Sequence, residues 1–189
     1  MKTKQTRLPE DPSQSLASLI RQKSRAGRLI TDDAILHLLR EQKDRPLQAE
    51  EFGSLLRNTM EQNGDLNELV SADGSRHYYS SKFMTSAYAS LLLRKQGNPL
   101  LLMAQIIRQH SAEYPRPVPL DLFTQTPFNF SREEVQGILE RMTAREEFRD
   151  IAQTTTSAFR VFLYSTRYLE PAHASMLAEW LDTGQSENP

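Results

Sequence analysis

The side chains best suited to chemistry are scattered along this chain. The four histidines share no spacing typical of a metal site: they are His37, His77, His110 and His173. The sequence contains no cysteine, no HExxH motif, no glycine-rich phosphate loop and no serine nucleophile motif. The acid pairs at 50–51 and 133–134 are adjacent, and neighbours on a helix point about 100° apart, so neither predicts an acid/base dyad. We therefore expect no enzyme activity, no metal and no cofactor.

Basic residues are concentrated at the start of the chain. Residues 1–28 contain seven basic and two acidic side chains, a net charge of +5, whereas the rest of the chain contains 16 basic and 22 acidic ones, a net charge of −6. A basic leading segment on an acidic body could bind nucleic acid or an acidic partner. It could equally serve only to keep the chain in solution.

The composition is that of an ordinary globular chain. Hydrophobic residues make up 38% and charged residues 25% of the 189 positions. No apolar run approaches the roughly 18 residues that a membrane-spanning helix needs, and the chain starts without the apolar core of a secretory signal. Together with the lack of cysteine, this predicts a cytoplasmic protein.

The clearest single element is a helix at Ser131–Arg145. Ser131 can cap its N-terminus, and Glu134 can complete a capping box. Apolar residues at helical spacing give it one buried face, made of Val135, Ile138, Leu139 and Met142. A β-rich segment with a turn follows, and a helix followed by a hairpin is typical of the end of a winged helix-turn-helix.

Four sequence blocks occur twice, in the same order and at a nearly constant interval. The pairs are LIRQKS (19–24) with IIRQHS (106–111), RLI (28–30) with RPV (116–118), EEFGSLL (50–56) with EEVQGIL (133–139), and YSSKFMTSAYASLL (79–92) with YSTRYLEPAHASML (164–177). The interval drifts by only a few positions from one pair to the next, which predicts a duplicated unit of about 85 residues.

Each copy is predicted to contain a helix, a short strand, two helices, a hairpin and a closing helix. We therefore predict a mostly α-helical (α+β) fold with small β-hairpins: two tandem winged-helix domains from an internal duplication, each closed by an extra C-terminal helix. The expected boundaries are a disordered arm at 1–13, domain 1 at 14–96, domain 2 at 97–183 and a disordered tail at 184–189. The alternative is one all-helical bundle, which the alternating patterns at 76–79 and 159–162 disfavour.

The outward face of the helix at 131–145 is acidic. Glu133 and Glu140 lie in the middle of this face, whereas a helix that enters the DNA major groove gains much of its affinity from Lys and Arg. The helix expected at 48–62 repeats the acidic pattern. Such a face could bind a protein partner, contact base edges, or simply be solvated.

Four arginines are candidates for nucleic-acid contact. Arg76 and Arg160 lie on the two expected hairpins, from which an arginine can enter a minor groove. Arg21 and Arg108 occupy equivalent positions on the first helix of each copy. Arginines that are only solvated have the same sequence pattern.

The two closing helices, Lys82–Lys95 and Pro171–Leu181, are more apolar than free terminal helices need to be. They could pack on their own domains, or they could form a homodimer or partner surface anchored by Tyr88 or Trp180. A small-molecule sensor in a cleft between the copies has only these two aromatic residues in its favour.

Residues 14–182 as a whole resemble a tandem winged-helix protein in element order and internal duplication. Two small winged helices on an acidic chain are similar to the kleisin-interacting tandem winged-helix subunits of bacterial SMC complexes. This resemblance implies domains that mainly bind protein and dimerise, and it carries over no site residue. We expect a non-enzymatic adaptor that binds protein and could belong to a DNA-associated assembly. The alternative is a DNA-binding transcriptional regulator that uses its wings and basic N-terminal arm.

Overall fold

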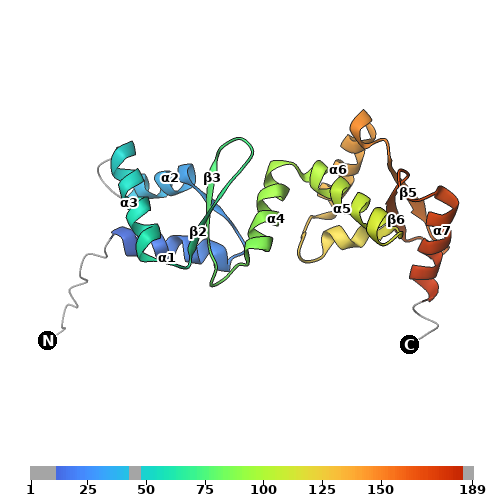
Figure 1. Ribbon diagram of the computed structural model, residues 1–189, viewed down its shortest axis with the longest axis horizontal. Helices are drawn as coiled ribbons and strands as arrows, with labels where there is room; N and C mark the ends of the chain where they lie inside the picture. Colours follow the sequence, from blue (N-terminus) through green and yellow to red (C-terminus); the bar gives the residue numbers. More distant parts are fainter. Residues whose placement is uncertain (1–11, 43–47, 185–189) are drawn as a thin grey trace. The chain divides into compact units, whose positions relative to one another are not determined.

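The chain divides into two compact units, with the boundary between Leu93 and Arg94. A computed structural model describes residues 12–42 and 48–184. Each unit combines helices with a small antiparallel sheet (Figure 1), which confirms the α+β class and excludes an all-helical bundle. The arm predicted at 1–13 and the tail predicted at 184–189 lie outside the described residues, except that residues 12, 13 and 184 belong to helices.

Unit 1 has its strands in the order β1-β3-β2. Its elements are α1 (Pro12–Arg25), β1 (Ile30–Thr31), α2 (Asp32–Gln42), α3 (Ala49–Gln62), β2 (Leu66–Val70), β3 (Arg76–Ser80) and α4 (Ser86–Gly97), which crosses the unit boundary. In the register, Ile30 is opposite Tyr78 and Leu66 is opposite Ser80. The central strand β3 therefore joins the β2–β3 hairpin to the short strand that follows α1.

Unit 2 has its strands in the corresponding order, β4-β6-β5. Its elements are α5 (Pro99–Glu113), β4 (Val118–Pro119), the 3₁₀-helix η1 (Leu120–Thr124), α6 (Arg132–Thr143), the 3₁₀-helix η2 (Glu146–Phe148), β5 (Ile151–Thr155), β6 (Val161–Ser165), α7 (Pro171–Glu179) and the π-helix η3 (Trp180–Gly184). Val118 is opposite Leu163, and Ile151 is opposite Ser165.

Helix α6 begins with the predicted capping box. The Ser131 hydroxyl accepts the Glu134 N–H at 3.1 Å, and the Glu134 carboxylate accepts the Ser131 N–H at 2.7 Å. These contacts satisfy two N–H groups that a helix start would otherwise leave unpaired. The predicted apolar face is buried at Val135, Ile138 and Met142, as expected.

Local capping and turn contacts determine where two elements begin. Helix α4 begins at Ser86 and not at the predicted Lys82, because the Thr85 hydroxyl accepts the Tyr88 N–H at 3.2 Å and so caps the helix there. In unit 2, β5 begins at Ile151, because Glu146–Phe148 forms a turn of 3₁₀-helix that buries Phe148.

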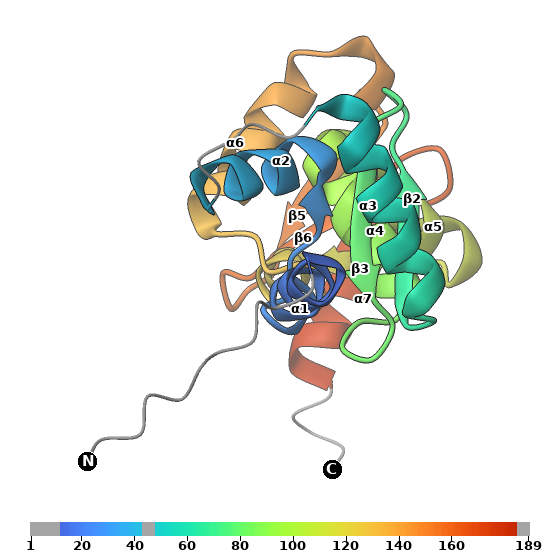
Figure 2. The ribbon, with the colours of Figure 1, turned by 90° about the vertical axis from the view of Figure 1, so that its left-hand side faces the viewer.

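Each sheet separates a main core from a smaller apolar cluster. In unit 1, Tyr78 belongs to the main core with α1, α2 and α3, whereas its neighbour Tyr79 packs with Met84 and Ala89 near α4. Successive side chains of a strand point to opposite faces, so α4 covers the face that α1–α3 leave open. Figure 1 shows α4 across β2 and β3 from these helices, and Figure 2 shows α1–α3 in front of the strands.

Helix α1 lies inside the basic segment of residues 1–28. Its Leu16 and Ile20 are 1% and 0% exposed and belong to the core of unit 1. Residues 12–25 are therefore part of the folded unit, and only residues 1–11 of the basic segment lie outside the described residues.

Candidate functional site: two polar clasps and the surfaces around them

The same polar contact joins the first helix of each unit to its hairpin. In unit 1, the Arg21 guanidinium donates through Nε to Asp65 Oδ2 at 2.9 Å and through Nη2 to the other carboxylate oxygen. In unit 2, Arg108 donates to Asp150 in the same two-point manner, with Nε 2.9 Å from Oδ2. Such bidentate pairs fix orientation as well as distance.

Two serines extend this contact into the sheet of unit 1. The Ser80 hydroxyl donates to Asp65 Oδ2 at 2.7 Å, and the Ser80 N–H donates to the Ser24 hydroxyl at 2.8 Å. Lys82 Nζ lies 3.6 Å from Asp65 Oδ1 on the outside. We call these five side chains clasp 1.

Clasp 2 repeats the arrangement residue by residue. The Ser165 hydroxyl donates to Asp150 Oδ2 at 2.7 Å, and the Ser165 N–H donates to the Ser111 hydroxyl at 3.0 Å. Arg167 Nη2, in place of the lysine, lies 3.2 Å from Asp150 Oδ1. Clasp 2 thus consists of Arg108, Ser111, Asp150, Ser165 and Arg167.

Both clasp carboxylates are held in their charged form. The hydrogen bond from Arg21 holds the pKa of Asp65 far below its usual range, although burial acts in the opposite direction. The hydrogen bond from Arg108, assisted by Ser165, lowers the pKa of Asp150 to about 2. A general acid or base needs a pKa near the working pH, so these aspartates fasten structure and do not transfer protons.

The clasps also fix the orientation of two arginines that the sequence offers as candidates for nucleic-acid contact. Arg21 and Arg108 retain only 27% and 20% of their side-chain exposure and direct their N–H groups at carboxylates of their own units. Sequence reasoning missed the clasps, although two of the repeated blocks contain their arginines and serines. Asp150 follows Asp65 at the interval that separates the repeated blocks, and this was the available signal.

The tip of the first hairpin, Ser71–Ser75, is held by its own residues. Asp73 accepts the Ser75 N–H at 3.0 Å and a hydrogen bond from the Ser71 hydroxyl, while Gly74 adopts the left-handed φ of 85° that the turn requires. Just beyond it, Arg76 is 57% exposed and lies 3.8 Å from Glu68. Arg76 is therefore open to solvent on a self-contained hairpin.

The tip of the second hairpin, Thr156–Arg160, is held by the end of the chain. Glu179 accepts the Ser157 N–H at 2.7 Å and the Ser157 hydroxyl at 2.9 Å. The Asp182 carboxylate accepts hydrogen bonds from Arg160 Nη1 at 3.0 Å and from the Thr156 hydroxyl. We call these contacts the latch, and through them Arg160 is paired with a carboxylate that is only 4% exposed.

The outward faces of α3 and α6 carry more acids than bases. Along α6, Glu133 and Glu140 are both exposed, and Glu140 accepts a hydrogen bond from Gln136 at 3.1 Å. Arg141 turns back to the Gly137 carbonyl at 3.0 Å. Helix α3 is similar, with three exposed glutamates and one arginine: Glu50, Glu51, Glu61 and Arg57.

The two aromatic partner candidates lie in different surroundings. Tyr88 is half-buried and packs against the cluster of Tyr79, Met84 and Ala89. Trp180, by contrast, is 63% exposed, and Met176, one helical turn earlier, is 59% exposed. Of the two predicted anchors, Trp180 is the one on the surface.

The four histidines differ in burial. His77 is buried, His110 is half-buried, and His37 and His173 are exposed. Over residues 12–42 and 48–184, no group of three or more His, Asp or Glu side chains is arranged to hold a metal ion. Within the same ranges, no helix is both long enough and apolar enough to cross a membrane.

Similarity to a bacterial protein places this architecture in a family. The chain is 30% identical over 182 residues to YdhW of Escherichia coli (strain K12), itself described as uncharacterised, and the match covers 95% of this chain and 82% of that protein. The chain belongs to the YdhW family. Residues 97–186 also match the profile of the YdhW C-terminal domain.

The YdhW C-terminal domain therefore corresponds to unit 2, from the cap of α5 to the end of η3. The YdhW match over 182 residues also takes in unit 1. No solved structure matches the chain. Neither the relative nor the domain is described by an activity.

Proposed function

We propose that this member of the YdhW family is a non-enzymatic tandem winged-helix adaptor that binds protein. In this proposal, each unit is a winged-helix domain closed by an extra helix, and the two units derive from an internal duplication. This is the arrangement for which the sequence resembles the kleisin-interacting subunits of bacterial SMC complexes.

The clasps support the duplication. Equivalent atoms make equivalent hydrogen bonds in both units, from Ser80 to Asp65 and from Ser165 to Asp150, each at 2.7 Å. The smaller apolar clusters correspond too, because Tyr79, Met84 and Ala89 precede Tyr164, Leu169 and Ala174 by the same interval that separates the two clasp aspartates. A polar network shared at four of five positions, with Lys82 replaced by Arg167, supports a common origin of the two units better than chance similarity of two folds.

The acidic outward face of α3 and α6 is the observation that carries the protein-binding assignment. Affinity for duplex DNA comes largely from cations that neutralise phosphates. The exposed Glu133 and Glu140 would instead face the DNA, and Arg21 and Arg108 are engaged in the clasps. These faces therefore suit a protein partner better than a phosphate backbone.

The closing helix of unit 2 offers the second part of a protein-binding surface. Met176 and Trp180 lie on the side of α7–η3 away from the buried Ala174 and Ala178. An exposed tryptophan beside a methionine is the kind of anchor that dominates protein interfaces. This surface could take a second copy of the chain or another protein.

Charge reversal on α6 tests the assignment. At about 0.15 M salt, fluorescence anisotropy of a labelled duplex should detect no binding by the wild-type chain, and Glu133→Arg with Glu140→Arg should create salt-dependent binding. The matched control is Glu146→Arg with Glu147→Arg, which makes the same change of charge on η2, where these side chains are 83% and 61% exposed.

The assignment would be abandoned if the wild-type chain bound duplex DNA with a steep salt dependence and reversal on α6 did not strengthen that binding. Analytical ultracentrifugation of wild type and Trp180→Asp addresses the second surface. A concentration-dependent dimer that Trp180→Asp abolishes assigns the surface to a second copy of the chain.

The alternative, a DNA-binding regulator, is favoured by one observation, the exposed Arg76 on a self-contained hairpin. Its test combines Arg76→Ala with deletion of residues 1–11. The deletion must end before Pro12, because α1 belongs to the core of unit 1. Loss of retarded duplex DNA in a gel would support the regulator, and an unchanged gel would exclude it.

A further inference from the structure

Unit 2 contains a cleft of about 290 Å³ whose polar lining is entirely basic. Val118, Leu122 and Phe162 form its apolar wall, and His110, Arg116 and Arg160 supply its polar groups. The cleft therefore combines an apolar surface with cationic groups. Its volume is at the small end of known ligand cavities, about 300–1,000 Å³.

Two other clefts have balanced charges. The cleft beside α6 is lined by Asp121 and Arg132, and the cleft beside α3 is lined by two acids and two arginines: Asp32, Glu68, Arg57 and Arg76. The basic cleft thus differs from both in charge.

The two arginines of the basic cleft are not equivalent. Arg160 is held by Asp182 at 3.0 Å and lies 3.9 Å from Asp121, so its charge is largely compensated. Arg116 pairs with no carboxylate in the described part of the chain, and its guanidinium lies 5.6 Å from the centre of the Tyr114 ring. The cleft therefore presents about one uncompensated positive charge, on a side chain oriented by an aromatic ring.

His110 adds a polar group to the cleft. Burial and the neighbouring Arg116 lower the pKa of His110, although Glu113 acts in the opposite direction. An imidazole offers an N–H as a hydrogen-bond donor. Because Arg160 is compensated by Asp182, the positive charge of the cleft comes mainly from Arg116, which suits a monoanion better than a multiply charged phosphate.

We propose that this cleft binds a small amphipathic carboxylate. The carboxylate is recognised by the Arg116 guanidinium, whose planar fork of donors fits two oxygens, and the apolar body lies along Val118, Leu122 and Phe162. This ligand site is independent of the protein-binding assignment, since none of these residues lies on the outward face of α6 or at Met176.

A titration with three matched probes tests the proposal on the full chain. Hexanoate has both a charge and an apolar body, hexan-1-ol keeps the body without the charge, and acetate keeps the charge without the body. Trp180, the single tryptophan of the chain, precedes Leu181 of the cleft lining, so its fluorescence can report binding. Amide signals of Arg116, Val118 and residues 120–122 in NMR spectra provide a second readout.

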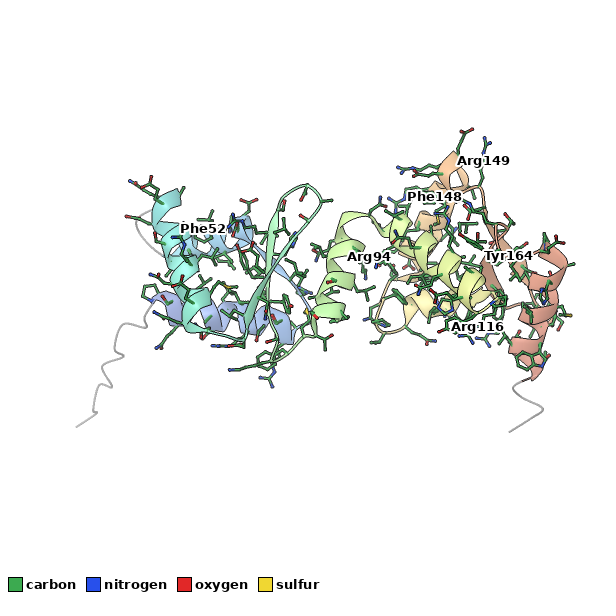
Figure 3. The ribbon with its side chains drawn as sticks, viewed as in Figure 1. Phe52, Arg94, Arg116, Phe148, Arg149 and Tyr164 are labelled. Atoms are coloured by element: carbon green, nitrogen blue, oxygen red, sulfur yellow. The ribbon has the colours of Figure 1, made fainter. Side chains whose placement is uncertain are left out.

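Hexanoate should bind saturably, and the other two probes at least about tenfold more weakly. Arg116→Gln should lower the affinity for hexanoate about tenfold, because it removes one charge-assisted contact. Arg116→Lys should retain part of this affinity. The matched control is Arg149→Gln, because Arg149 is 73% exposed and lies at the opposite edge of unit 2 in Figure 3.

Three outcomes would overturn the proposal. Equal binding of hexanoate and hexan-1-ol would show an apolar surface that ignores charge. Equal losses in Arg116→Gln and Arg149→Gln would show non-specific attraction to a basic surface. Absence of hexanoate-induced shifts in the amide signals of Arg116, Val118 and residues 120–122 would exclude the site, whatever the tryptophan fluorescence does.

Discussion

The two hairpins of this molecule are fastened alike at their bases and differently at their tips. Clasp 1 and clasp 2 hold the ends of β3 and β6 through the same serine and aspartate contacts. The first tip is closed by hydrogen bonds among its own residues, Ser71–Ser75, whereas the second is bound by Glu179 and Asp182 of α7 and η3. The shared contacts identify what the fold requires, and the unshared ones indicate where the units differ in function.

Because of this difference, Arg76 and Arg160 have different surroundings, although the sequence predicts both of them on hairpins. Arg76 follows a tip that is held by its own hydrogen bonds, and Arg160 is paired with a nearly buried carboxylate. If the chain contacts DNA through a hairpin, the first hairpin is the candidate. The latch also holds Arg160 at the lining of the basic cleft.

The largest expected effect comes from breaking a clasp. Asp150→Ala leaves the partly buried Arg108 without its partner, which should reduce the free energy of unfolding of unit 2 by about 3 kcal/mol. Asp65→Ala should act equally on unit 1 if the clasps are equivalent. Amide hydrogen exchange, which reports each unit separately, provides the measurement.

The control for the clasp variants is Glu146→Ala. This residue makes an exposed pair with Arg149, in which both side chains are at least 73% exposed, so its loss should cost less than about 1 kcal/mol. A clasp variant no more damaging than this control would show that the clasps do not stabilise the units.

The second effect is sensitivity to acid. The pKa of Asp150 falls from an ordinary 3.8 to about 2 on folding, so its stabilising contribution is complete above about pH 4 and is lost as the pH falls towards 2. The contribution is about 2 kcal/mol, from 1.36 kcal/mol per pKa unit. Urea unfolding followed by Trp180 fluorescence between pH 5 and pH 2 should show this loss.

Asp150→Asn should remove most of that pH dependence in unit 2. Asp73→Asn is the control, because Asp73 also has a pKa lowered to about 2, by the Ser71 and Ser75 hydrogen bonds, but lies exposed on the first hairpin. An acid profile that Asp150→Asn leaves unchanged would contradict the assignment to clasp 2.

The third effect is local, at the latch. Glu179→Ala removes the acceptor of the Ser157 N–H, so exchange of that amide should accelerate about tenfold, the consequence of losing one hydrogen bond of about 1.4 kcal/mol. Amides of the first hairpin should not respond. Equal acceleration in both hairpins would show that the tips do not differ as described.

The smallest effect is expected at Trp180. Because this side chain is 63% exposed, Trp180→Ala should change the free energy of unfolding by less than about 0.5 kcal/mol. Tyr88→Ala, in the closing helix of unit 1, should cost about 2 kcal/mol because it removes a half-buried ring from an apolar cluster. Thermal unfolding of both variants measures the contrast.

Local signals were readable from the sequence. The Ser131–Glu134 capping box and the stripe Val135–Met142 predicted α6, and alternating residues predicted both hairpins. These features depend on residues close together in the chain, where spacing alone determines which side chains meet.

The long-range polar contacts could not be predicted from local patterns in the sequence. Arg21 resembles any surface arginine until folding brings it to Asp65, 44 positions later, and the latch joins Ser157 to Glu179, 22 positions later. The basic cleft depends in the same way on residues from several separate elements. Comparing the repeated sequence blocks position by position could have found the clasps, because their residues recur at nearly the same spacing.

The π-helical turn at Trp180–Gly184 has a consequence for how this chain can change. A π-turn accommodates one more residue than an α-turn, and Asp182 lies inside this turn, whereas Glu179 lies just before it. Loss of one amino acid within the turn would therefore change the position of Asp182 relative to Arg160 but leave the contacts of Glu179 with Ser157 in place. A length change of one residue could thus loosen one half of the latch while the other half still holds the second hairpin.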